Sequence, residues 1–244
     1  MKAVFRWIAL VLLAFVALQL FFIARIAMMT VVDPESTTFQ RSEAWRIAHD
    51  RDRLRWSQRW VPYEQISDNL KRAVIASEDD SFSYHDGVDW EALEKAWQRN
   101  EKAAEQAARR AQLAPARAKP PKVVGASTIT QQLAKNLLLS GERSLMRKGQ
   151  ELVLTILLER MLDKQRILEI YLNNVEWGEG VFGADAAAQH YFRKPASRLN
   201  AYEAARLAVM LPAPKRFEKS PSSAYVLGRS ATIVARMGGV DLPN

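Results

Sequence analysis

The feature of this sequence that most restricts its fold is an apolar run near the N-terminus, Trp7 to Ala24. Gln19 is the only polar residue among these 18, and Arg25 follows them. A helix of this length rises about 27 Å, close to the roughly 30 Å hydrocarbon core of a bilayer. Cleaved signal peptides have apolar regions of about 7 to 15 residues and a small-residue cleavage site, and this sequence offers no convincing one. We therefore expect an uncleaved transmembrane anchor over residues 7–32.

The charges that flank this run indicate its orientation. Lys2 and Arg6 precede it, whereas the acidic residues Asp33 and Glu35 follow it. Basic residues are retained on the cytoplasmic side of a membrane. We therefore expect residues 1–6 in the cytoplasm and the bulk of the chain outside.

The composition of the chain is that of one globular domain with an appendage. The chain has 244 residues, of which 48% are hydrophobic and 25% charged, and these values exclude a disordered or collagen-like protein. It has no cysteine, so it needs no disulfide and carries no thiol chemistry. The net charge of +8 predicts an anionic partner: nucleic acid, anionic lipid or a phosphorylated substrate. Export of the domain argues against nucleic acid.

Residues 33–61 form a membrane-proximal linker in which tryptophans and arginines are mixed. Trp45, Trp56 and Trp60 stand among four arginines. This pattern occurs in nucleic-acid binding and at lipid interfaces, and equally in a short amphipathic stretch that leads into a domain. In the domain itself, residues 62–244, signals for helix starts and ends recur, and no alternating pattern typical of strands is sustained. This predicts a mainly α fold.

Local signals mark several helix boundaries. Thr128 to Gln131 fits a capping box, and Gly141 is expected to end the helix that follows. Residues 145–172 form long helical sequence with a break near Asp163. Asn200 to Glu203 is a second capping box. We also expect a helix to end at Pro212 and a final helix to run from near Pro221 to Gly238. A loop is expected at Gly178, Gly180 and Gly183.

Residues 99–122 differ in composition from the rest of the domain. They are rich in Ala, Arg, Lys and Gln, and carry seven basic residues against two acidic ones, a net charge of +5. We expect a mobile basic insertion here. The alternatives are a solvated charged helix and a contact with anionic lipid.

The first cluster that could carry chemistry is Glu78, Asp79 and Asp80, which follow an apolar run from Ala73 to Ala76. A carboxylate held partly out of water has a raised pKa and can act as a general base or acid. The residues by themselves fit a solvated helix cap or turn equally well, and His85 fits a structural role.

The second cluster lies between Gly125 and Asn136 and places hydroxyl groups at a helix start. Free N–H groups and a partial positive charge at that start could bind phosphate or sugar hydroxyls. Gln132, Lys135 and Asn136 follow on one face of the helix. An ordinary cap followed by a surface face is the alternative.

The third cluster sets two cations beside a carboxylate. Arg147 and Lys148 precede Glu151 by four and three residues, so all three can project from one side of a helix. A surface salt-bridge pattern would look the same.

Together these clusters resemble the motifs of the peptidoglycan glycosyltransferase family, the module also found in class A penicillin-binding proteins. Five blocks correspond in order over roughly residues 62–220. They are ED-x-x-F-x-x-H-x-G at Glu78 to Gly87, G-x-STITQQL-x-KN at Gly125 to Asn136, RK-x-x-E at Arg147 to Glu151, KQRILEIYLN at Lys164 to Asn173, and AAQHYFRK at Ala187 to Lys194. Only 50 residues follow the last block, so we expect a monofunctional member without transpeptidase activity.

The resemblance implies a lysozyme-like fold and assigns roles to residues. Glu78 and Glu151 are the expected catalytic residues, Glu78 as the base that takes a proton from the acceptor sugar, and Glu151 as a support at the donor phosphate or at a divalent ion. The expected substrate-binding residues are Asp79, Phe82, His85, Ser127, Thr128, Gln132, Lys135, Asn136, Arg143, Arg147 and Lys148. The stretch between Gly87 and Gly125 is longer than the family pattern.

The resemblance also implies the reaction and its setting. Lipid II would be polymerised into β-1,4-linked strands with inversion at C1 and undecaprenyl pyrophosphate as the leaving group. No cofactor is expected for this chemistry, although a bound Mg or Mn ion is compatible with it. The expected partners are lipid II, the growing glycan strand, the bilayer and other cell-wall synthesis proteins, with no nucleic acid. The expected location is a bacterial inner membrane, with one span and a periplasmic catalytic domain.

Two rival functions can be weighed against this one. Since the family resembles lysozyme, the first is a glycan-cleaving enzyme with two carboxylates in its groove. A hydrolase has no need of pyrophosphate-binding cations such as Lys135, Arg143 and Lys148. The second is an inactive membrane-bound scaffold, and the retained Glu78 and Glu151 argue against it.

Overall fold

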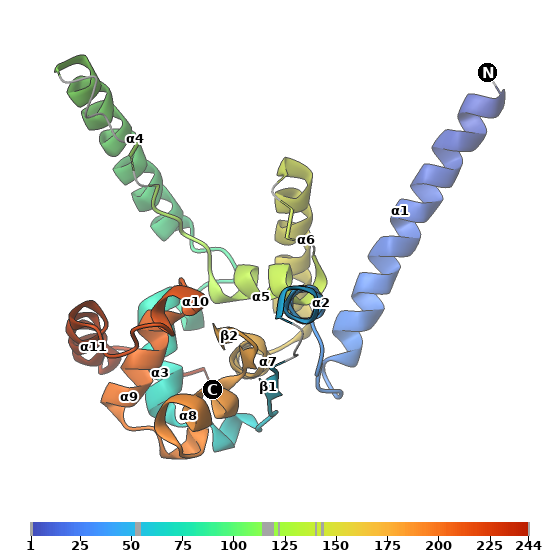
Figure 1. Ribbon diagram of the computed structural model, residues 1–244. Coiled ribbons are helices and arrows are strands. Elements are labelled where there is room, and N and C mark those ends of the chain that lie inside the picture. Colours follow the sequence, from blue (N-terminus) through green and yellow to red (C-terminus); the bar gives the residue numbers. More distant parts are fainter. Residues whose placement is uncertain are drawn as a thin grey trace.

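The computed structural model describes residues 2–51, 55–113, 120–121, 123–139, 141–142 and 144–243. In this part of the chain helices predominate, as the sequence predicted. Figure 1 shows that α1 (Lys2–Met28), α4 (Trp90–Leu113) and α6 (Leu145–Met161) rise on the same side of the molecule, above the remaining helices.

Helix α1 is long and apolar enough to cross a membrane, by length and composition. Its side chains are almost all exposed, and only Phe22 and Ile26 near its lower end are buried. The polar Gln19 faces α6, where its side-chain amide exchanges two hydrogen bonds, of 3.3 and 3.1 Å, with that of Gln150. The single polar residue of the apolar run is therefore satisfied inside the protein.

The other helices surround one apolar core. Helices α3 (Asp68–Glu78), α9 (Ala201–Met210) and α11 (Ala224–Met237) pack against one another, and α5 (Ile129–Leu138) packs against α2 (Thr38–Arg51), α6 and α7 (Lys164–Asn174). The remaining elements are α8 (Ala184–Phe192), α10 (Pro214–Phe217), and the 3-10 turns η1 (Tyr63–Gln65), η2 (Phe82–Tyr84) and η4 (Ala196–Arg198). Trp177, Tyr171 and Phe82 are the largest side chains that are completely buried.

A small sheet replaces part of the predicted glycine loop. Strands β2 (Glu176–Gly178) and β3 (Val181–Phe182) are antiparallel, and β1 (Ser57–Gln58) pairs in parallel with β3. Gly180 makes the turn with φ +74°, and a Cβ on it would lie 2.0 Å from the Arg55 carbonyl oxygen. Strands of two or three residues are too short to show an alternating pattern, so the sequence could not predict them.

The predicted capping boxes are confirmed. Thr128 and Asn200 each accept a hydrogen bond from the backbone N–H three residues later, and the side chains of Gln131 and Glu203 return the bond. The predicted break near Asp163 is also confirmed, because Asp163 caps α7 after α6 has ended at Met161. Local polar chemistry thus sets these helix starts.

Other boundary predictions were wrong. Helix α5 ends at Leu138, before Gly141, because Leu139 is already extended. Helix α11 begins at Ala224, where Ser223 supplies the cap, and not near Pro221. Of the expected basic insertion, residues 99–113 continue α4 as regular helix, which agrees with the solvated-helix alternative.

The aromatic linker agrees best with the alternative of a short stretch that leads into the domain. Trp56 stacks on Phe182 with ring centroids 4.5 Å apart, and Trp60 lies beneath Arg166. Trp45 alone of the three linker tryptophans is largely exposed. Much of this linker therefore packs on the domain.

Candidate active site

The carboxylate of Glu78 lies at the end of α3, whose apolar face is buried in the core. The helix stops there because Asp79 adopts a non-helical conformation, with φ −166° and ψ 73°. Glu78 is half-buried, and its Oε2 accepts a hydrogen bond of 3.0 Å from Nε2 of Gln132 on α5. Burial raises the pKa of Glu78, and the Gln132 hydrogen bond opposes that rise. A carboxylate with a raised pKa at a pocket wall is suited to accept a proton.

The amide of Gln132 is held at both ends. Its Oε1 accepts a hydrogen bond of 3.0 Å from the hydroxyl group of Tyr171, which is completely buried on α7. Since an ionised carboxylate can only accept hydrogen bonds, the amide nitrogen must face Glu78 and the oxygen must face Tyr171. Tyr171 therefore fixes the orientation in which Gln132 stabilises the charged form of Glu78.

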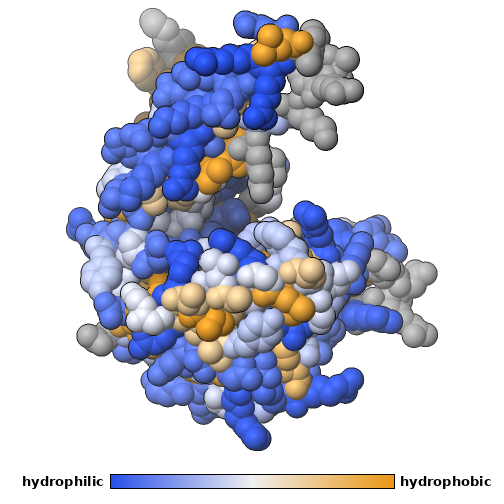
Figure 2. Space-filling view, turned by 90° about the vertical axis from the view of Figure 1, so that its left-hand side faces the viewer, coloured by the Kyte–Doolittle hydropathy of each residue, from blue (hydrophilic) through white to orange (hydrophobic). Residues whose placement is uncertain are grey.

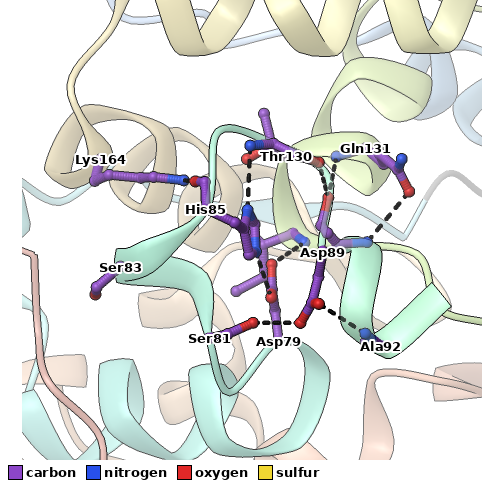
Figure 3. A network of polar contacts seen from close by, with 12 residues as sticks. Asp79, Ser81, Ser83, His85, Asp89, Ala92, Thr130, Gln131 and Lys164 are labelled. Atoms are coloured by element: carbon purple, nitrogen blue, oxygen red, sulfur yellow. Dashed lines mark hydrogen bonds and ion pairs between the residues drawn. The ribbon is translucent and has the colours of Figure 1, made fainter. Parts of the chain in front are cut away.

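Asp79 and His85 connect the turn after α3 to the start of α5 (Figure 3). Oδ1 of Asp79 lies 2.8 Å from Nε2 of His85, and Oδ2 accepts a bond of 2.9 Å from the N–H of Ile129. The N–H of Gly87 donates to Nδ1 of His85, so the ring proton is on Nε2 and points at Asp79. Both carboxylate oxygens of Asp79 therefore accept hydrogen bonds from within the protein, next to Glu78.

Phe82 and Thr128, expected to bind substrate, are buried. Phe82 lies under the ammonium group of Lys164, which is 4.5 Å from the ring centroid. The hydroxyl of Thr128 donates to the carbonyl of Gly87 at 2.7 Å and accepts from the N–H of Gln131. In this structure both residues hold the active-site loop in place and offer no free polar group to a ligand.

Glu151 and its two cations form the predicted cluster on α6. Nη1 of Arg147 lies 2.7 Å from one carboxylate oxygen, and Lys148 pairs with the other. Glu151 itself is buried. With both oxygens facing cations, Glu151 does not fit a divalent metal site, and the described residues hold no group of three metal-type ligands. Arg143, the remaining predicted cation, lies outside the described residues.

Lys135 and Asn136 face a pocket of about 620 Å³ next to this cluster, with Gln132 and Arg147 also on its wall. Desolvation lowers the pKa of Lys135, although the side chain still reaches solvent. The charge of Glu151 opposes this effect, and Arg147 reinforces it. In the described part of the chain Lys135 makes no ion pair, so its charge is free to meet an anion in the pocket.

Glu78 opens on a different pocket, of about 550 Å³. Lys95 and Arg99 of α4 form one wall, and Ser127 and Arg236 contribute to the others. Figure 2 shows this face hollowed between an upper lobe that carries α4 and a lower lobe. Glu78 thus lines one pocket, and its hydrogen-bond partner Gln132 lines the other.

A family model described as Transglycosylase matches residues 48–238. This chain belongs to the transglycosylase family. Biosynthetic peptidoglycan transglycosylase of Burkholderia thailandensis is 50% identical over 99% of this chain and 90% of its own length. The protein of that name from Burkholderia orbicola is 51% identical over 94% of this chain and 87% of its own length. The one from Paraburkholderia xenovorans is 50% identical over 98% of this chain and 95% of its own length.

Membership of the transglycosylase family confirms the expected enzyme class, a glycosyltransferase of peptidoglycan synthesis, on a mainly helical, lysozyme-like fold. The structure adds residues that sequence reasoning missed. Tyr171 stands inside a family block but received no role, because nothing local shows that it reaches Gln132. Arg236, which pairs with Asp80 at 2.8 Å, and Glu176 lie outside the motif clusters.

Proposed function

We propose that this transglycosylase polymerises lipid II into β-1,4-linked glycan strands, with undecaprenyl pyrophosphate as the leaving group. The observation that carries the proposal is the position of Glu78, a carboxylate of raised pKa that lines one pocket and accepts a hydrogen bond from Gln132 on the wall of a second. One of these pockets has cationic residues on its wall beside the amide that holds Glu78. A hydroxyl acceptor and an anionic leaving group require these two features.

Glu78 acts on the acceptor. A sugar hydroxyl is a poor nucleophile at neutral pH, so Glu78 takes the proton of the acceptor 4-hydroxyl as that oxygen forms its bond to C1 of the donor. The bond from C1 to the pyrophosphate oxygen breaks, and its electron pair leaves with the pyrophosphate. Attack from the face opposite the leaving group inverts the α-linkage to β.

The cations act on the donor. Negative charge accumulates on the pyrophosphate as it leaves, and charge-assisted hydrogen bonds of about 1.5–3 kcal/mol each can stabilise it. Lys135 is the cation with no competing ion pair among the described residues, and Arg147 lines the same pocket. Glu151 holds Arg147 and Lys148 in position, which is a supporting role, and no metal is required for it.

The length and apolar composition of α1 support a membrane setting. We place the chain in a bacterial inner membrane with α1 as its single span and the catalytic domain in the periplasm, where a lipid-linked substrate is within reach. The proposed partners are lipid II, the growing strand, the bilayer and other proteins of cell-wall synthesis. The chemistry described for Glu78 and Lys135 needs no cofactor.

Incubation of the purified full chain with lipid II in detergent or vesicles tests this function. We expect polymer on a gel that lysozyme digests, and one prenyl pyrophosphate released for each bond formed. Lys135→Ala should fold normally and make polymer at a rate at least about tenfold lower, because one charge-assisted bond is lost. A well-folded wild-type chain in lipid that makes no polymer would refute the proposal.

A further inference from the structure

Three charged groups meet at one end of the pocket that contains Lys135. Glu43 from α2 and Glu176 from β2 line this pocket, and Lys215 from α10 lies beside both. Lys215 pairs closely with Glu43, which also accepts a hydrogen bond of 3.0 Å from Arg46. The same ammonium group is 3.6 Å from Oε1 of Glu176, beyond hydrogen-bond distance.

Glu176 is the unusual member of this group. Only 6% of the residue is exposed, and its Oε1 accepts no hydrogen bond within the described part of the chain. A buried carboxylate oxygen without a hydrogen bond is costly, and native proteins rarely retain one without a use. Burial raises the pKa of Glu176 to about 7, Lys215 opposes the rise, and Glu43 and Glu218 add to it. Glu176 thus lines the pocket with a carboxylate oxygen that has a cation 3.6 Å away and accepts no hydrogen bond in the described part of the chain.

The pocket wall carries two separate charged groups. Lys135 lies near Arg147 and Glu151, whereas Glu176 lies near Glu43 and Lys215. Its volume of about 620 Å³ is in the range of small-molecule sites. A sugar with a phosphate at C1 has the matching arrangement, an anion at one end and hydrogen-bond donors along the ring.

We propose that Glu176 binds the sugar hydroxyl or acetamido N–H groups of the donor glycosyl unit, while the C1 phosphate of the same unit meets Lys135 and Arg147. A neutral donor fits this end better than an ammonium group, because Lys215 already supplies the positive charge beside Glu176. Lys215 pairs closely with Glu43 and lies 3.6 Å from Oε1 of Glu176, so this oxygen still lacks a hydrogen bond. This inference rests on the proposed polymerase function.

Two ligands separate the sugar contact from the phosphate contact. The first is a lipid II whose 4-hydroxyl is replaced by hydrogen, which binds as a donor and cannot be extended. The second is the same prenyl pyrophosphate without a sugar. Binding of each to the full chain is measured by titration for wild type, Glu176→Ala, Glu176→Gln and Lys135→Ala, with Glu64→Gln as an exposed-carboxylate control.

We expect Glu176→Ala to bind the sugar-bearing ligand about tenfold more weakly, and to bind the prenyl pyrophosphate as wild type does. Lys135→Ala should weaken both, and Glu64→Gln neither. Glu176→Gln, which keeps the shape of the side chain, decides the matter if the alanine variant fails to fold, and should lose part of the sugar-dependent affinity. Equal effects of the Glu176 variants on both ligands, or no effect on either, would overturn the inference. Wild-type chain that neither binds these ligands nor makes polymer would refute the polymerase function itself.

Discussion

At the scale of single residues, Gln132 joins the carboxylate of Glu78, the proposed base, to Tyr171 in the core. Its amide donates to Glu78 and accepts from Tyr171, and this pairing has one permitted orientation while Glu78 is ionised. The ionisation of Glu78 therefore depends on a phenol that never meets the substrate. Tyr171 is a positioning residue in this sense.

Tyr171→Phe tests that dependence. Without the phenol hydroxyl the Gln132 amide can turn its oxygen toward Glu78, which disfavours the carboxylate and raises its pKa further. We expect the acidic limb of the polymerisation rate to move to higher pH, with a several-fold lower rate near neutrality. Tyr202→Phe, on α9, serves as the control. An unchanged pH profile in a stable Tyr171→Phe protein would show that Gln132 does not need this anchor.

Glu176 gives a prediction about stability. Its folded pKa of about 7 lies above the ordinary 4.5, so between these values the native state holds a proton that the unfolded state has lost. The free energy of unfolding should therefore fall as pH rises through this window, by at most about 3 kcal/mol. Denaturant unfolding at pH 5 and pH 8 measures this change. The free energy of unfolding should fall less between these two pH values for Glu176→Gln than for wild type. Identical pH dependence in the two proteins would contradict a raised pKa at Glu176.

At the scale of elements, the two capping boxes form a natural pair of variants. Thr128 caps α5 beside the active site, and Asn200 caps α9 away from it. Each alanine substitution should cost about 1 kcal/mol of stability, and Thr128→Ala more, because Thr128 also holds the Gly87 carbonyl. Thermal unfolding and polymerisation rates together check this. Only Thr128→Ala should slow catalysis, and a slow Asn200→Ala enzyme would mean that the rate simply follows stability.

The same elements show what could be predicted from sequence. Side chains that bond to nearby backbone, such as Thr128, Asp163 and Asn200, gave correct helix starts because the relevant chemistry lies within four residues. The end of α5 and the sheet of β1, β2 and β3 depend on partners far along the chain. The motifs gave Glu78 and the cation cluster of α6. They gave no sign that Phe82 and Thr128 are buried, since burial is decided by tertiary packing.

At the scale of the whole molecule, α1, α4 and α6 rise on the same side (Figure 1), and each of these helices carries exposed apolar side chains. Trp90 and Trp97 on α4 are about as exposed as the residues of α1, and Leu145 and Met146 begin α6 with almost no cover. Large apolar side chains that are exposed on this scale are typical of membrane contact. The domain itself is therefore expected to touch the bilayer for which α1 is the proposed span.

Vesicle binding of a chain without residues 1–21 tests this expectation. The truncation leaves the buried Phe22 and Ile26 in place, so the domain should remain folded. We expect it to cosediment with lipid vesicles, and replacement of Trp90, Trp97, Leu145 and Met146 by serine to reduce binding several-fold. Tyr225→Ser, an exposed aromatic on α11, is the control. A truncated chain that stays in solution would place all membrane contact in α1.

Glu78 is the group on which the proposed chemistry depends, so its replacement tests the mechanism most directly. The measurement is the initial rate of glycan formation from lipid II as a function of pH, for wild type and for a folded Glu78→Gln protein. Wild type should lose activity as pH falls through the raised pKa of Glu78, and Glu78→Gln should be slower by about 10²- to 10⁴-fold at every pH. A Glu78→Gln enzyme that keeps both the wild-type rate and the wild-type acidic limb would contradict the assignment of Glu78 as the base.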